Sequence, residues 1–127
     1  NEFGIQQEMI CLIKVKSGIL KMNNCSLSLD GLTKETHKKA PCIVSFPNSS
    51  IEIFHCIFKG DTIHDSKTAG ILSIKSDTVV YGCSFAHFNS GAIMIDSKPE
   101  ISCLISENII QSCETAGIFI EGAKSKP

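Results

Sequence analysis

Acidic and histidine side chains gather in the short segment "GDTIHD", residues 60–65. Asp61, His64 and Asp65 are residue types that serve as general acids and bases. Sugar hydrolases need two or more carboxylates that converge on one groove, whereas these residues follow one another on one predicted loop. We therefore expect no catalytic residues, with a carbohydrate-active site built on these acids as the alternative.

A second charged set occupies equivalent places in the repeat described below: Lys75, Asp96 and Glu121. These residues are expected to form a charged column on the surface. Exposed ion pairs contribute only about 0–1 kcal/mol each, so we interpret the column as a surface ladder. Asp96 and Glu121 are further acids for the carbohydrate-active alternative.

Seven cysteines, an odd number, lie inside apolar segments of the chain. A secreted disulfide framework usually has an even count in a loop-rich chain, and the absence of a Cys-x-x-Cys pair gives no zinc spacing. We expect small, buried side chains in a reducing compartment, which predicts a cytoplasmic location. No metal and no cofactor are expected.

The composition restricts the possible partners. The chain has 127 residues and a net charge of −1, so no global field attracts nucleic acid or an anionic membrane. Arginine is absent, and no apolar segment reaches membrane-spanning length. We expect one domain over residues 1–127, and the first residue, Asn1, suggests a fragment of a longer chain.

One eight-residue pattern recurs along the chain. It reads "LKMNNCSL", "IEIFHCIF", "TVVYGCSF" and "CLISENII", starting at residues 20, 51, 78 and 103. Its anchor residues, spaced 31, 27 and 25 apart, are Cys25, Cys56, Cys83 and Asn108. A period of this length indicates a solenoid or a repeat array.

A second family of segments lies between these and alternates with period two. Its predicted inward pairs are Ile13/Val15, Val44/Phe46, Leu72/Ile74, Ile93/Ile95 and Ile118/Ile120. Leucine-rich repeats share part of the anchor pattern, but they follow each strand with a helix or helical turn. Period two in both halves of the repeat favours an all-β parallel β-helix of about four coils. Loops near residues 31–41 and 60–68 would absorb the longer spacings.

Stacked coils would place the four anchors in one internal ladder. Strands in neighbouring coils lie about 4.8 Å apart, and an inward Asn at a corner bonds the backbone there. Cysteine has a similar volume and fills the same corner without needing a hydrogen-bond partner.

Four outward side chains are the expected partner contacts. Phe54 and Tyr81 should stack on one face, flanked by Asn23 and Ser106, and Met94 and Phe119 should be adjacent on another sheet. Exposed apolar patches often mark interaction sites. The alternative is that a flanking loop or a missing segment covers them.

The segments "GCSFAHFNSGAIMID" and "ENIIQSCETAGIFIEGA" resemble the repeats of a domain shared by carbohydrate-binding proteins and sugar hydrolases. The resemblance covers nearly the whole chain from about Ile10 and implies a right-handed, pectin-lyase-like parallel β-helix. Intracellular eukaryotic members include F-box substrate receptors and Shc-binding proteins of the spindle and cytokinesis. The resemblance implies a rigid scaffold that binds protein partners, in a setting of cell division and the cytoskeleton. It provides no matched catalytic residues, and the pectate-lyase type of enzyme uses an arginine that this chain lacks.

Three functions therefore remain open. The first is a non-catalytic protein-interaction scaffold of an intracellular regulatory protein. The second is a carbohydrate-active domain, with Phe54 and Tyr81 as a sugar-stacking platform. The third is a structural segment of a fibre or adhesin, because uncapped end coils could make end-to-end or domain contacts.

Overall fold

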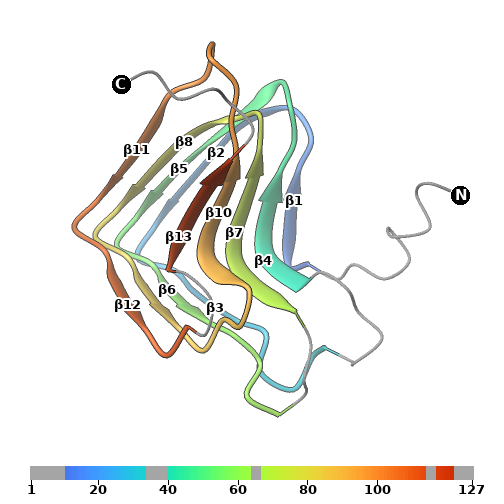
Figure 1. Cartoon of the computed structure of the whole chain (residues 1–127), viewed down its shortest axis with the longest axis vertical. Helices are drawn as coiled ribbons and strands as arrows, with labels where there is room; N and C mark the ends of the chain where they lie inside the picture. Colours follow the sequence, from blue (N-terminus) through green and yellow to red (C-terminus); the bar gives the residue numbers. More distant parts are fainter. Residues whose placement is uncertain (1–10, 34–39, 64–66, 114–116, 122–127) are drawn as a thin grey trace, which may run out of the picture.

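The computed structural model describes residues 11–33, 40–63, 67–113 and 117–121. In this part of the chain, strands are present and no helix is found. The strands wind into stacked coils whose sides form three parallel sheets (Figure 1). This confirms the prediction of an all-β parallel solenoid of about four coils.

Each complete coil contributes one strand to each sheet. The first sheet contains β1 (Ile13–Val15), β4 (Ala40–Ser45), β7 (Thr68–Ile74), β10 (Gly91–Asp96) and β13 (Ile118–Glu121). The second contains β2 (Gly18–Asn23), β5 (Ser49–Phe54), β8 (Asp77–Tyr81) and β11 (Cys103–Ser106). The third contains β3 (Ser26–Ser28), β6 (Ile57–Lys59), β9 (Ser84–Ala86) and β12 (Ile109–Gln111).

The segment "IEIFHCIF" is two strands joined by a corner. β5 ends at Phe54, β6 begins at Ile57, and His55 between them has a φ of 54°. The equivalent residues in the other coils are Asn24, Gly82 and Glu107, with φ values of 60°, 68° and 60°. One left-handed residue just before each anchor therefore turns the chain from the second sheet into the third.

The interior is filled by columns of apolar side chains. Phe58 and Phe85 occupy one register position in neighbouring coils, and their rings stack with centroids 4.7 Å apart. Gly70 makes room for this stack, since a Cβ on it would lie 2.6 Å from the Phe85 ring and 2.5 Å from the Ala92 carbonyl oxygen. Gly70 therefore permits close packing within β7.

Two of the predicted inward pairs are wrong by one residue. Ile13 pairs with Ile43, and Ile43 with Ile71, so the inward pairs of β4 and β7 are Ile43/Ser45 and Ile71/Ser73. Val44/Phe46 and Leu72/Ile74 do not face the interior. The error arose because these strands carry apolar residues on both faces and buried serines on the inner one. Leu72 consequently joins the outward side chains.

The two predicted loops lie partly outside the described residues, which exclude 34–39 and 64–66. The first is shorter than predicted, because Ala40 and Pro41 already belong to β4 and are buried. Thr68, at the end of the second, is the first residue of β7.

Candidate functional site

Phe54 and Tyr81 form an aromatic pair on the outer surface of the second sheet. They are register partners on β5 and β8, and their ring centroids lie 6.5 Å apart at 54°. Tyr81 is 38% exposed, and Phe54 is half-buried. Asn23 and Ser106 continue the column in the flanking coils.

A third ring, which the sequence did not assign to this face, joins the pair. The imidazole of His55 meets Tyr81 edge-on, with centroids 5.7 Å apart. The missing side chain of Gly82 makes this possible, because a Cβ there would lie 2.6 Å from Nδ1 of His55. In the sequence, His55 precedes the anchor Cys56, and Gly82 precedes the next anchor, Cys83. This pair of residues at equivalent positions was the signal for the cluster.

Met94 and Phe119 lie on the first sheet, away from the aromatic cluster. They are register partners on β10 and β13, and Leu72 on β7 precedes Met94 in the same column. Phe119 is 41% exposed, and Leu72 and Met94 are half-buried. Val44 also belongs to this outward column. It is fully buried, although it lies outside the cluster of apolar side chains that fills the solenoid interior. The exposed part of the column therefore begins at Leu72.

A mostly apolar pocket of about 230 Å³ adjoins this column. Its lining residues are Ala40, Pro41, Lys67, Ala69, Leu72, Ser90 and Met94. We call Leu72, Met94 and Phe119, together with this pocket, the apolar face. The four predicted contact residues thus divide between two surfaces on different sheets.

The anchor residues meet at the corner between the second and third sheets. The backbone N–H of Cys25 donates to Sγ of Cys56 at 3.4 Å, and that of Cys56 donates to Sγ of Cys83 at 3.5 Å. At Cys83 the acceptor is Oδ1 of Asn108, 2.8 Å away. The thiols therefore take part in hydrogen bonds, whereas the sequence suggested that they only fill space.

The environment of these thiols disfavours reactivity. Burial, the largest effect, raises the pKa of Cys56 and of Cys83 above the ordinary value of a thiol. All seven cysteines lie in the described part of the chain, and all are free. A raised pKa keeps a thiol protonated, and the protonated form is a poor nucleophile.

Of the predicted acids that the structure describes, Asp61 precedes β7, whereas Asp96 and Glu121 lie at the opposite end of the first sheet. Asp61 is buried, and its carboxylate accepts hydrogen bonds from the amides of Gly31, Thr33 and Ile63 and from the hydroxyl of Thr33. His64 and Asp65 lie outside the described residues. Asp61 thus holds two neighbouring loops together and is poorly placed to exchange a proton with a substrate.

Asp30, in the other loop, makes the corresponding hydrogen bonds in the opposite direction. Its Oδ1 accepts the amide and the hydroxyl of Thr62, at 2.8 and 2.7 Å, and Lys59 lies 3.3 Å from its Oδ2. The amide of Thr62, followed by its hydroxyl, lowers the pKa of Asp30 below its ordinary value. Each of the two loops therefore supplies an aspartate that accepts hydrogen bonds from the other loop.

The predicted charged column is only partly in register. Asp96 pairs with Glu121 across β10 and β13, but its partner on β7 is Ile74. Lys75 nevertheless reaches Asp96, with its Nζ 3.8 Å from Oδ2.

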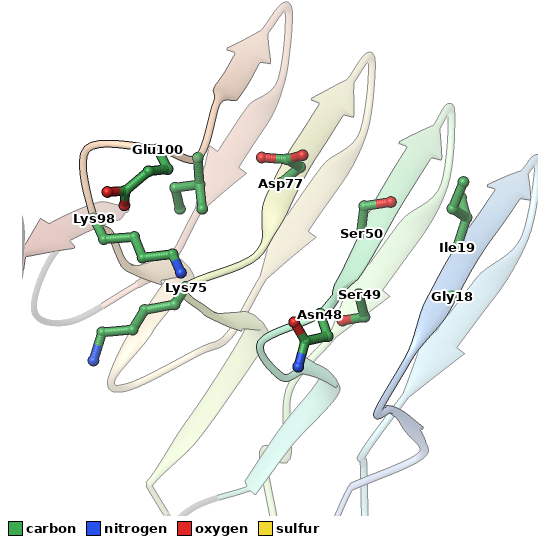
Figure 2. A pocket seen from close by; sticks show the side chains of 10 residues that line it. Gly18, Ile19, Asn48, Ser49, Ser50, Lys75, Asp77, Lys98 and Glu100 are labelled. Atoms are coloured by element: carbon green, nitrogen blue, oxygen red, sulfur yellow. The ribbon is translucent and has the colours of Figure 1, made fainter.

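A polar pocket that sequence reasoning missed lies between the first and second sheets, where the chain turns. Figure 2 shows Lys75, Asp77, Lys98 and Glu100 from two successive coils beside Ser50 and Asn48. The pocket has a volume of about 420 Å³. Oδ1 of Asp77 accepts the amide of Ser102 at 2.9 Å. Asp77 and Ser50 are register partners on β8 and β5, and aligning the repeats would have placed both polar residues at this corner.

Among the described residues, no group of three or more histidine, cysteine, aspartate or glutamate side chains could hold a metal ion. No helix in this part of the chain has the length and apolar character to cross a membrane.

The coil geometry and the internal ladder define a parallel β-solenoid with an ordered, apolar interior. Residues 54–126, more than half of the chain, match the family described as "Right handed beta helix region". The chain belongs to this family. No curated protein and no solved structure gives a significant match.

Proposed function

We propose that this chain is a non-catalytic scaffold that binds a protein partner, within an intracellular regulatory protein of a eukaryote. The apolar face is the single observation that carries the proposal. Side chains of Leu72, Met94 and Phe119 stand in one column on a rigid sheet, next to a pocket that could take an apolar side chain. Methionine and aromatic residues are favoured at interface cores.

Rigidity supports this use of the fold. The backbone of the column is fixed by parallel pairing on both sides of β7 and β10. A partner would therefore not have to order this surface on binding, and that reduces the entropic cost of association. An extended peptide with an apolar residue for the pocket and another for Phe119 is the kind of partner that fits.

The cellular setting rests on two observations. Seven free thiols suit a reducing compartment. Residues 82–96 and 107–123 resemble repeats of a domain that also occurs in intracellular eukaryotic regulatory proteins, and this supports the regulatory role.

The test is capture of partners on three immobilised forms of the chain. These are the wild type, Met94→Ser/Phe119→Ser, and the control Ile57→Ser/Ile109→Ser, which removes outward apolar side chains from the third sheet. We expect one protein to be retained by the wild type and the control and lost by the first variant. That protein must then bind the purified chain directly. Equal retention by all three forms would contradict the proposal.

The polar pocket favours a second candidate, a carbohydrate-active domain. Asp77 and Glu100 bring two carboxylates to one pocket, as sugar hydrolysis requires. Incubation with a panel of polysaccharides should then release reducing ends or unsaturated products, and Asp77→Asn should abolish the release. If no polysaccharide gives a product, hydrolase and lyase activity are both excluded for this candidate.

A further inference from the structure

Within residues 11–33, 40–63, 67–113 and 117–121, no strand covers the last coil of the solenoid. β11, β12 and β13 are the edge strands of the three sheets, and within the described residues nothing pairs with their outer edges. The inward residues Ile118 and Ile120 are 43% and 57% exposed. Their partners one coil earlier, Ile93 and Ile95, are fully buried. Open edges and exposed interior residues together form a template for another coil.

The opposite end offers a coil of matching pattern. There β1, β2 and β3 are the edge strands. Their inward side chains, which are only partly buried except for Val15, include Ile13, Leu20, Met22 and Leu27. If the register of the first sheet continued into a second molecule, Ile118 would meet Ile13 and Ile120 would meet Val15. Apolar side chains would then face apolar side chains.

Charge is complementary between the two ends. The N-terminal coil exposes Lys14, Lys16 and Lys21, whereas the C-terminal coil exposes Glu107 and Glu121. The same register places Lys16 opposite Glu121. Asp96 and Glu121 are neighbours of like charge, which is unfavourable across a sheet, and Lys16 of a second molecule would offset this repulsion.

The internal ladder has a polarity that also continues across this junction. In each coil the anchor amide donates to the anchor side chain of the following coil: Cys25 to Cys56, Cys56 to Cys83, and Cys83 to Asn108. The amide of Asn108 is next in the series. In the continued register, its acceptor would be Sγ of Cys25 in the second molecule.

We propose that the C-terminal coil of one molecule stacks on the N-terminal coil of a second copy, with Ile118 against Ile13 and Glu121 against Lys16. Such a contact joins two different surfaces, so it does not close after two molecules. Association is therefore head to tail and extends to longer assemblies as the concentration rises.

A charge-reversal experiment tests the arrangement by light scattering and sedimentation equilibrium. Lys16→Glu and Glu121→Lys should each weaken self-association about fivefold, because each puts like charges at the junction. Mixing the two variants in equal amounts should restore association, since every junction between unlike molecules again pairs opposite charges. The control Lys67→Glu, away from both ends, should behave as the wild type.

Several results would overturn the proposal. One is a wild-type chain that stays monomeric at every concentration, which would leave these ends to another occupant. Another is a mass that stops at the dimer. A third is a mixture of the two variants that associates no better than each alone. Circular dichroism of each variant verifies the fold, and if one single variant fails to fold, the double variant Lys16→Glu/Glu121→Lys must associate as the wild type does.

Discussion

The backbone amide of Cys83 donates a hydrogen bond to Oδ1 of Asn108, 2.8 Å away in the next coil. The same side chain donates from Nδ2 to the carbonyl oxygen of Val80, at 3.1 Å. One amide side chain thus bonds the backbone on both arms of the preceding corner. In the earlier coils, thiols occupy this place and make longer contacts of the same kind.

Replacing Asn108 should show how much this corner depends on its two bonds. Asn108→Ala leaves the Cys83 amide and the Val80 carbonyl without this partner, and we expect a loss of about 1–3 kcal/mol in the free energy of unfolding. Asn108→Cys should cost less, because a thiol already serves at the other corners. Urea denaturation measures both variants, and equal losses would contradict the ladder.

The two inward serines of the first sheet should respond in opposite directions. Oγ of Ser45 is buried and has no hydrogen-bond partner in the described part of the chain. Oγ of Ser73 lies 2.7 Å from Oγ1 of Thr78 and donates to the carbonyl of Ser76. Ser45→Ala should therefore stabilise the fold by about 1 kcal/mol, and Ser73→Ala should destabilise it by about the same amount. The same sign for both, in thermal or urea unfolding, would count against this register.

Gly70→Ala should be among the most damaging small substitutions. The new Cβ would overlap the Phe85 ring and the Ala92 carbonyl, so we expect a loss of about 3 kcal/mol. Gly117→Ala is the matched control, since its nearest neighbours, at 3.1 and 3.2 Å, are side-chain atoms of Ile110 near the exposed end. A Gly70→Ala protein as stable as the Gly117→Ala protein would refute the packing described for β7.

The stability contributed by Asp30 should depend on pH. Its pKa is lower in the folded protein than the ordinary value of 3.8, so the unfolded chain binds the proton more readily. The ionised carboxylate therefore contributes stability above pH 3.8, and this is lost as the pH falls through the folded-state pKa. Asp30→Asn resembles the protonated acid, so its deficit in unfolding free energy should be present at neutral pH and shrink in acid. A deficit that is constant or grows in acid would contradict the contact with Thr62.

Alkylation should separate the cysteines by their positions in the coils. Cys25 is exposed, whereas Cys42 is fully buried, and burial raises its pKa to about 12. Iodoacetamide should therefore label Cys25 in the native protein and spare Cys42 until the chain unfolds. Peptide mass spectrometry measures the order of labelling, and early labelling of Cys42 would show that β4 is not held as described.

The architecture was predictable because its signals are periodic. Alternation in both halves of the repeat and anchors such as Cys56 and Asn108 indicated stacked coils and the place of each corner. The outward register of Phe54 with Tyr81, and of Met94 with Phe119, followed from aligning these anchors.

Other features depend on contacts that the repeat pattern of the sequence does not reveal. In β4 and β7 both faces are apolar, so the buried Ser45 and Ser73 looked like outward residues, and Leu72 was placed inside. The role of Asp61 depends on a loop about thirty residues earlier in the chain, which packing alone brings close. The polar pocket around Asp77 and Glu100 is assembled by the stacking of corners, each of which is unremarkable in sequence.

Binding of a protein partner at the apolar face can be tested by a direct affinity measurement. A partner captured as described above is titrated into the wild type, Met94→Ser/Phe119→Ser, and the control Ile57→Ser/Ile109→Ser. Because two interface-core side chains are removed, we predict that the first variant raises the Kd at least about tenfold while the control leaves it unchanged. The same Kd for all three proteins would contradict the claim.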